Sequence, residues 1–286
     1  MQNNYSKNIS ILLFGTLLIS TSGVLGKYIA MPAEAIIFCR AFLAGIFIFI
    51  FCKIKKIDLK IHTKKDKVSF FLSGFLMGAH WVTYFIALKL SNVALGMLSI
   101  YTYPIITVFL EPFFSKQKIS KIHILLAIFV LVGVYILVPE FSLENDELKG
   151  ILFGVLSAFF YAIRNLLVKE EVKKYNGSML MLYQMLVITV CLIPVLFFSD
   201  FSNIESQLPL LVLVALVTTA IGHTLLVNSL KHFSATTTSI ISSVQPIFGI
   251  IIAFIFVNEI PNFKTFIGGS LILATVVIES LRSRKK

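Results

Sequence analysis

The chain has 286 residues, of which 57% are hydrophobic and only 14% are charged. Soluble domains carry about 25% charged residues, so this composition and the mean hydropathy of +0.92 exclude an ordinary soluble enzyme and predict a membrane protein. The net charge of +11 would suggest a nucleic-acid partner on a soluble chain, but here it bears on membrane topology. Cys39, Cys52 and Cys191 are expected to be small buried hydrophobes, with no disulfide and no metal site.

Ten apolar stretches follow one another along the chain. Each has about the 20 residues that cross a hydrocarbon core of about 30 Å at about 1.5 Å per residue. They cover residues 9–29, 34–52, 68–88, 93–114, 122–139, 148–168, 178–198, 208–230, 234–257 and 263–281. The first lacks a convincing cleavage site, so it is expected to be a spanning helix and not a targeting peptide. The predicted fold class is an all-α integral membrane protein with ten transmembrane helices.

The loops alternate in charge, which predicts the orientation of the chain. Positive residues concentrate on one side, and the positive-inside rule makes that side cytoplasmic. Both termini are then expected in the cytoplasm of a chain that crosses the cell (inner) membrane ten times. The cations are Lys53, Lys55, Lys56, Lys60, Lys64, Lys65, Lys67, Lys116, Lys118, Lys121, Lys173, Lys174, Arg282, Arg284, Lys285 and Lys286. Topology alone accounts for these lysines, so no nucleic-acid partner is expected, and a nucleic-acid or anionic-lipid role for the lysine-rich loop is the lesser alternative.

An internal repeat appears when the chain is shifted on itself by 142 residues, the difference between Leu230 and Leu88. The shift aligns Leu88-Lys89 with Leu230-Lys231, Pro104-Ile105 with Pro246-Ile247, Phe114 with Phe256, and Trp81 with His223. A duplicated five-helix unit is the economical interpretation, with repeats at residues 1–139 and 148–286. Because five is odd, the second copy would run in the opposite sense, and inverted repeats of this kind place a substrate site near the midplane between the halves.

These residues resemble the drug/metabolite transporter superfamily, specifically its EamA-type ten-helix members, over the entire chain. The carriers of the resemblance are Ala87-Leu88-Lys89-Leu90-Ser91-Asn92, Ser229-Leu230-Lys231-His232-Phe233-Ser234, Pro104, Pro246, Val257-Asn258-Glu259, Ile267-Gly268-Gly269, Gly133 and Arg40. The resemblance implies a transporter of amino acids or related metabolites, usually an exporter. The first copy departs from the pattern, because Ser115-Lys116-Gln117 stands where the second has Val257-Asn258-Glu259.

Polar and aromatic side chains near mid-depth are the candidate substrate-binding residues, because polar groups are costly inside a bilayer. His80, Trp81 and Tyr84 share one side of the third stretch, and the eighth stretch brings His223 to a comparable depth. Either imidazole could bind a carboxylate or relay a proton, or could be a neutral group hydrogen-bonded between helices. For the two aromatic residues packing is the favoured alternative, since large aromatic side chains fill cores of any kind.

The ninth stretch carries a polar stripe of Thr238, Ser242, Gln245 and Gly249 at helical spacing. Ser242 and Gln245 are candidate substrate contacts, because the stripe is expected to face protein or water and not lipid.

Two prolines interrupt the fourth and ninth stretches. Pro246 frees the carbonyl of Ser242, and Pro104 frees that of Ile100. The freed carbonyls could face substrate, or the prolines could mark kinks with local repair. Both prolines are candidates for gating, and the neighbouring tyrosines are further candidates for substrate contact, namely Tyr101 and Tyr103.

Charged groups inside the stretches are candidates for gating or coupling. Arg40 lies about 9 Å along its helix from the outer end at about 1.5 Å per residue, too deep to snorkel, so a partner is expected. Glu111 and Arg164 lie in inner halves, where snorkelling to the cytosol is an alternative to an ion pair between them. Small residues at Gly74-x3-Gly78, at Gly150-x3-Gly154 and on one face of the first stretch (Gly15, Ser22 and Gly26) predict close helix packing.

The leading hypothesis is a secondary transporter that moves a small polar metabolite by rocking of two half-repeats. No GxxxxGK[ST] motif occurs, so a gradient must supply the energy, and a proton is the candidate coupling ion. No cofactor is expected, and the protein could be a monomer or a homodimer. A channel or scaffold and an exporter of drugs or nucleoside-type metabolites are the alternatives. An enzyme is disfavoured, because no GxSxG or HExxH motif occurs and His62-x3-Asp66 has the wrong spacing for an acyltransferase.

Overall fold

The computed structural model describes residues 2–114, 121–137, 142 and 144–283, and within them it contains helices and no strand. The first half holds α1 (Gln2–Tyr28), α2 (Ala33–Ile54), α3 (Lys64–Leu90), α4 (Val93–Ile100), α5 (Tyr103–Phe114) and α6 (Lys121–Leu137). The second half holds α7 (Asp146–Glu171), α8 (Gly177–Cys191), η1 (Ile193–Phe197), α9 (Ile204–Leu213), η2 (Val214–His223), α10 (Thr224–Ser229), α11 (Ala235–Ile241), η3 (Ser242–Val244), α12 (Gln245–Val257) and α13 (Phe263–Ser283). Each of the ten predicted stretches corresponds to one helix or to a run of consecutive helical segments.

The helices are long and apolar enough for a bilayer. Six helical runs of the described chain, including Ile204–Ser229, could each cross a membrane, and four shorter apolar helices accompany them. The seventh stretch is shorter than expected, because α8 ends at Cys191 and a 3₁₀ turn containing Pro194 follows. Cys39 and Cys52 are buried as predicted, whereas Cys191 is exposed, so that part of the cysteine prediction is wrong.

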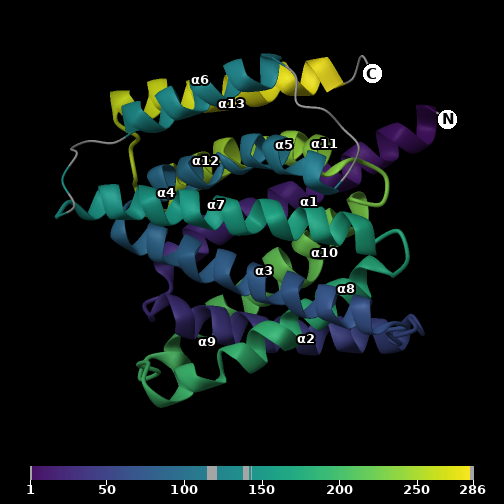
Figure 1. Cartoon of the computed structure of the whole chain (residues 1–286). Helices are drawn as coiled ribbons and strands as arrows, with labels where there is room; N and C mark the ends of the chain where they lie inside the picture. The colour runs from purple at the N-terminus through teal and green to yellow at the C-terminus, as the bar shows by residue number, and fades with distance from the viewer. Residues whose placement is uncertain (1, 115–120, 138–141, 143, 284–286) are drawn as a thin grey trace.

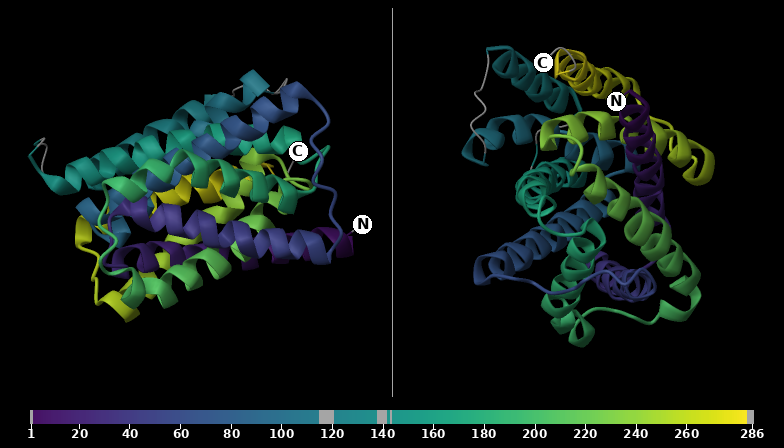
Figure 2. Two further views of the ribbon diagram at one scale, coloured as in Figure 1. Left: turned by 90° about the horizontal axis from the view of Figure 1, so that it is seen from below. Right: turned by 90° about the vertical axis from the view of Figure 1, so that its right-hand side faces the viewer.

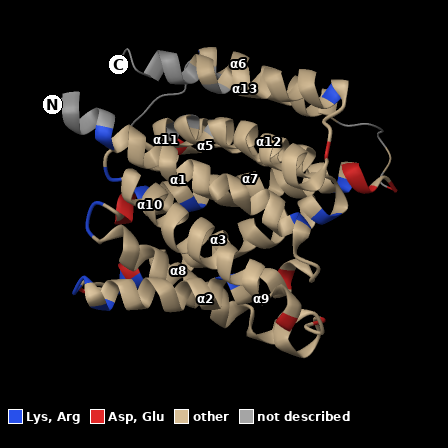
Figure 3. Ribbon diagram, turned by 180° about the vertical axis from the view of Figure 1, so that it is seen from behind, with Lys and Arg blue, Asp and Glu red and all other residues tan. Residues whose placement is uncertain are grey.

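The helices run in roughly the same direction when seen from the side (Figure 1), although several are tilted from it (Figure 2). α6 and α13 lie side by side at one edge, and α2, α8 and α9 lie at the opposite edge, with α1, α3 and α7 between them (Figure 1). The view along the helices separates the same groups (Figure 2). Both termini lie at the end of the bundle where α2 leads into the lysine-rich loop (Figure 3).

Asparagine and threonine side chains begin several helices. Asn92 accepts a hydrogen bond from the backbone N–H of Leu95 at 2.9 Å and starts α4, and Asn145 starts α7 in the same way. Such caps satisfy N–H groups that have no partner within the helix. The connections between helices are therefore fixed by local sequence.

The 142-residue repeat is visible in side-chain contacts. The ammonium of Lys27 donates to the carbonyls of Leu88 and Ser91 at 3.0 and 2.7 Å. Lys169, which lies 142 residues later, donates to the carbonyls of Leu230 and Phe233 at 2.8 and 2.6 Å. Each lysine thus closes the C-terminal end of the third helix of its own half, and the two halves form the same contact.

Small residues bring helices close together, as their spacing predicted. A Cβ built on Gly74 would lie 2.7 Å from the Cβ of Val187 in α8, and one built on Gly150 would lie 2.8 Å from the Cβ of Ser91. Contacts this short are not available to any larger residue. α3 therefore packs directly against both α7 and α8.

Candidate functional site

A small polar cavity lies at the centre of the bundle. Its volume is about 30 Å³, room for one or two waters, since a water needs about 10–15 Å³ on this measure. Seven of the eight predicted substrate contacts line it, namely His80, Trp81, Tyr84, Tyr101, Tyr103, His223 and Gln245. The eighth, Ser242, is not among the lining residues but contacts Tyr101 through its carbonyl. Residues from both halves meet here.

Tyr161 of α7 completes the cavity and was not predicted. Its ring stacks on His80 with 4.3 Å between centroids and meets the edge of Tyr103 at 4.9 Å. Ile19 lies 142 residues earlier and also lines the cavity. The sequence signal for Tyr161 is the same as for Tyr84, an aromatic hydroxyl within an apolar stretch.

The two histidines differ in their partners. His80 Nδ1 lies 2.9 Å from the hydroxyl of Ser157, which also donates to the His80 carbonyl at 2.7 Å. His223 Nδ1 is buried and has no hydrogen-bond partner among the described residues, and its ring meets the edge of Trp81 with 5.3 Å between centroids. His80 therefore fits the alternative of a histidine hydrogen-bonded between helices. His223 Nδ1 is available for a hydrogen bond to a ligand in the cavity.

Arg40 is fully buried and is held only by neutral groups. Its guanidinium donates to Thr219 at 2.6 Å, to Thr218 at 3.0 Å and to Ser22 at 3.0 Å. The guanidinium carbon lies 4.0 Å from the centroid of the Trp81 ring, a cation–π contact. Ser22 and Trp81 line the cavity, so Arg40 places a positive charge directly behind its wall.

The two threonines that hold Arg40 belong to η2, which is a π-helix. Both of their hydroxyls also contact the Val214 carbonyl, at 2.6 and 3.1 Å. Wider π-type turns occur frequently at functional sites. Nothing in the sequence indicates this distortion, because Val214–His223 contains no proline and has the composition of an ordinary apolar helix.

Arg164 is a second fully buried arginine, and its placement corrects two predictions. It bonds to Gln184 at 3.2 and 2.5 Å and to Asn165 at 2.9 Å, and not to Glu111. The guanidinium does not snorkel, because none of the residue is exposed. Glu111 is buried in α5, and within the described chain no carboxylate contacts either guanidinium.

Tyrosines of the first half repair the break in the ninth span. The carbonyl of Ser242, which Pro246 deprives of its helical donor, accepts the hydroxyl of Tyr101 at 2.9 Å. Tyr101 also contacts Gln245 Oε1, and Tyr103 donates to the carbonyl of Ser239 at 3.1 Å. The carbonyl freed by Pro246 therefore bonds to protein in this structure. This fits the alternative in which the proline marks a kink with local repair.

The rest of the predicted stripe and the fourth span behave similarly. Thr238 and Gly249 are buried and face protein as expected. The first-half proline, Pro104, follows a break between α4 and α5 at Tyr101 and Thr102. Gln117 lies outside the described residues. Broken spans in matching places of the two halves are the arrangement that transporters use around a midplane site.

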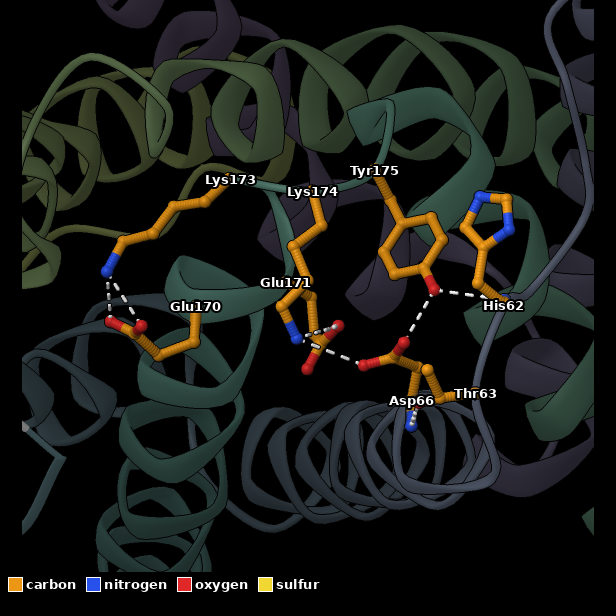
Figure 4. A network of polar contacts seen from close by, with 8 residues as sticks. All are labelled: His62, Thr63, Asp66, Glu170, Glu171, Lys173, Lys174 and Tyr175. Carbon is orange, nitrogen blue, oxygen red and sulfur yellow. Dashed lines mark hydrogen bonds and ion pairs between the residues drawn. The ribbon is translucent and has the colours of Figure 1, made fainter.

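A polar network ties the halves together at the end of the bundle that carries the termini (Figure 4). Asp66 of α3 accepts the hydroxyl of Tyr175 at 2.6 Å and pairs with the ammonium of Lys174 at 3.0 Å. The hydroxyl of Tyr175 accepts the backbone N–H of His62 at 3.1 Å. The hydrogen bond to Asp66 and the charge of Glu171 raise the pKa of Lys174, so the lysine stays charged at neutral pH.

Contacts between the halves also close the opposite end. Glu259 Oε2 accepts the backbone N–H of Val93 at 2.8 Å, which adds a carboxylate to the start of α4. Ser199 donates to Glu34 at 2.9 Å, and Gln207 accepts the N–H of Ala30 at 3.1 Å. The two halves are thus in contact at both ends of the bundle.

An all-helical bundle of ten apolar spans, with broken fourth and ninth spans around a polar centre, is a membrane transporter of the drug/metabolite transporter type. The chain belongs to the EamA-like transporter family, which it matches over residues 6–138 and again over residues 148–281.

Curated relatives are similar along nearly their whole length. An uncharacterized transporter YxxF of Bacillus subtilis is 24% identical over 97% of this chain and 89% of its own. The pseudopaline exporter CntI of Pseudomonas aeruginosa is 24% identical over 89% and 88%. A crystal structure of a protein with 16% identity superposes with a TM-score of 0.75 over 98% of both chains, which supports the fold alone. These relatives are transporters, so the chain is not an enzyme.

Proposed function

We propose that the protein is a secondary transporter of small metabolites that carry a carboxylate, such as amino acids or related compounds. The observation that carries the proposal is the pair of fully buried arginines, Arg40 and Arg164, whose partners are all neutral. A buried charge without a counter-charge is costly, and an anionic ligand in the cavity beside Arg40 would lower that cost. His223 Nδ1 supplies a hydrogen-bonding atom on the same cavity.

The transport cycle that we propose is alternating access between two inverted repeats, 1–139 and 148–286. A cavity of about 30 Å³ is too small for a metabolite, so the halves must separate to admit one. Separation at one end breaks the Asp66–Lys174–Tyr175 network, and separation at the other breaks the Glu259–Val93 contact. Rocking of one repeat against the other around a fixed central site would open these ends in turn.

Export across the cell membrane, with both termini cytoplasmic, is the proposed direction and topology. The lysine-rich loop between α2 and α3 supports this orientation through the positive-inside rule. One relative carries the name of an exporter, which agrees with the direction. A proton is the coupling ion to examine, with His80, His223 and Glu111 as the groups that would carry it.

The test is a thermal-shift panel on the purified chain with amino acids, their decarboxylated amines, nucleosides and cationic drugs. A ligand that binds only the folded state raises the melting temperature, and we expect carboxylates to do so while the matched amines do not. His223→Gln should remove the shift, whereas the control His232→Gln changes an exposed histidine and should keep it. Stabilisation by cationic drugs alone would refute the carboxylate proposal.

Transport in vesicles tests the carrier itself. Accumulated unlabelled substrate should drive counterflow of labelled substrate, which a channel cannot support. If the transport rate does not depend on pH or on membrane potential, coupling to protons is ruled out.

A further inference from the structure

A second hollow lies away from the centre, between α2, α8, η2 and α10. Its volume is about 290 Å³, against about 30 Å³ for the central cavity. Its apolar walls come from α2 (Phe47, Ile48 and Phe51) and from η2 (Leu216, Ala220 and Ile221). Phe51 is 45% exposed and Ile221 is 41% exposed, so in a membrane this groove opens to lipid.

One part of the groove is polar. Ser178 at the start of α8, together with Thr224 and Asn228 on α10, lines it there. Thr224 is 8% exposed, and its hydroxyl has no hydrogen-bond partner among the described residues. Neighbouring hydroxyls behave differently, since Thr218 donates to the Val214 carbonyl at 2.6 Å and Ser229 to the Leu225 carbonyl at 2.9 Å. A buried hydroxyl left unpaired beside an open groove calls for a ligand that can bond to it.

Positive charge lies just beyond the polar part of the groove. The N–H of Lys55 donates to the carbonyl of Phe51 at 2.9 Å, so Lys55 is one helical turn past a residue of the groove wall. Lys53 and Lys56 flank it, and all three are exposed. From mid-bundle toward the lysine-rich loop, the surface therefore changes from apolar to hydroxyl-bearing to cationic.

We infer that this groove binds one anionic phospholipid of the cytoplasmic leaflet. An acyl chain would occupy the apolar part, and an ester carbonyl would accept the hydroxyl of Thr224. The phosphate group would lie beside Lys55 and Lys56, because anionic head groups attract lysines next to a membrane span, whereas the ammonium of Lys53 lies over the Phe49 ring. This order matches a phospholipid in register with the bilayer, whereas a soluble metabolite offers no long apolar segment.

Binding at this groove would act on the central site through η2. The same π-helix presents Ala220 and Ile221 to the groove and Thr218 and Thr219 to Arg40. A lipid bound in the groove would therefore restrict movement of η2, the helix that positions the Arg40 guanidinium. The inference concerns the lipid face alone and does not depend on the identity of the cargo.

The experiment is native mass spectrometry of the delipidated full chain, incubated with phosphatidylglycerol or with phosphatidylcholine of the same acyl chains. We expect one tightly retained lipid, with phosphatidylglycerol preferred. Ala220→Phe fills the groove and should weaken retention of both lipids about tenfold or more, equivalent to about 1.4 kcal/mol or more. The matched control Ala274→Phe alters an exposed alanine of α13, at the far edge of the bundle from α2 and α8 (Figure 1), and should bind as wild type does.

Two further variants separate the parts of the site. Thr224→Val has the same shape without the hydroxyl, so it should reduce retention of both lipids while leaving the lipid-free melting temperature unchanged or higher. Replacement of Lys55 and Lys56 by Gln should abolish the preference for phosphatidylglycerol and keep phosphatidylcholine binding. Equal retention by Ala220→Phe and wild type would overturn the inference. So would a chain dimer that Ala220→Phe dissociates, because the groove would then be an interface between copies.

Discussion

Arg40 shows how a charge is kept inside the bundle by hydroxyl groups alone. Its planar guanidinium donates to three hydroxyls and lies on the face of Trp81. A lysine ammonium could neither reach all three hydroxyls nor stack in this way. The side chain is therefore specific to this position, and an exchange within the basic residues is not conservative.

Arg40→Lys is expected to destabilise the protein and to abolish binding of the carboxylate ligand. Loss of hydrogen bonds to a charged group should lower the free energy of unfolding by about 1.5–3 kcal/mol. Thermal unfolding in detergent measures the first effect and the ligand panel measures the second. Lys231→Arg, at an exposed position, is the control, and wild-type binding by Arg40→Lys would contradict the role given to Arg40.

Tyr101→Phe tests the repair of the ninth span. The substitution removes one of two donors to the Ser242 carbonyl, which also accepts the backbone N–H of Gln245, so it should cost about 0.5–1.5 kcal/mol of stability. Pro246→Ala restores a backbone N–H to that carbonyl, so the double variant should recover part of the loss. A double-mutant cycle in thermal unfolding measures the coupling, and strict additivity would show that the two groups do not act on the same carbonyl.

At the scale of elements, the decisive features are places where a helix is interrupted or approaches another closely. The breaks at α4–α5 and at α11–η3–α12 face each other across the centre through Tyr101 and Tyr103. Close approach of α3 to α8 depends on Gly74, which has no room for a side chain. The two helix breaks bring polar groups to the central cavity. Gly74 sets the distance between α3 and α8.

Gly74→Val should push α3 away from α8. Its Cβ would lie 2.7 Å from that of Val187, and such overpacking costs about 1–3 kcal/mol. Val187→Gly in the same chain removes the clashing side chain and should restore much of the lost stability. A melting temperature of Gly74→Val equal to that of wild type would mean that the helices do not pack at this point.

At the scale of the whole molecule, the two polar closures are expected to oppose each other. Asp66→Asn weakens the network with Lys174 and Tyr175, whereas Glu259→Gln weakens the contact with Val93. In a chain freed of native cysteines, Ile100→Cys places a thiol at the central cavity. An impermeant reagent added outside the cell should label this thiol faster in Glu259→Gln and slower in Asp66→Asn. Equal labelling of the two variants would contradict alternating closure.

The lysine of this network should not make transport sensitive to pH near neutrality. The partner Asp66 and the nearby Glu171 raise the pKa of Lys174 above its ordinary 10.5. A group with a raised folded-state pKa stabilises the protein below its unfolded pKa and loses that contribution as pH rises through the folded pKa. The Lys174 contribution is therefore constant at pH 6–8 and lost only in strong alkali, which melting temperatures of wild type and Lys174→Gln across that range will check.

The orientation of the halves is tested by the sides on which two loop residues lie. Positive-inside topology places Lys60 in the cytoplasm and Asn145 outside. Single cysteines at these positions should react with an impermeant reagent on opposite faces of the cell membrane. Labelling from the same face would overturn the inverted repeat and the proposed transport cycle with it.

The sequence by itself determined the class of protein, the ten spans and the depth of the central residues. These follow from local quantities, because the bilayer sets the length of each apolar stretch and each polar group inside it carries a cost that composition reveals. Seven of the eight predicted contacts consequently line one cavity. The 142-residue shift can also be read from the sequence, and Lys27 and Lys169 make matching contacts at that spacing.

Only the tertiary structure decided the partners. Arg164 bonds to Gln184 and not to Glu111, Arg40 to two threonines of a π-helix, and Tyr101 to a carbonyl that Pro246 had freed. Periodicity states which face a side chain occupies, but not which helix faces it or how that helix is wound. Such pairings depend on how helices from distant parts of the sequence pack together. If one helix shifted by one turn along its neighbour, its side chains would contact different residues.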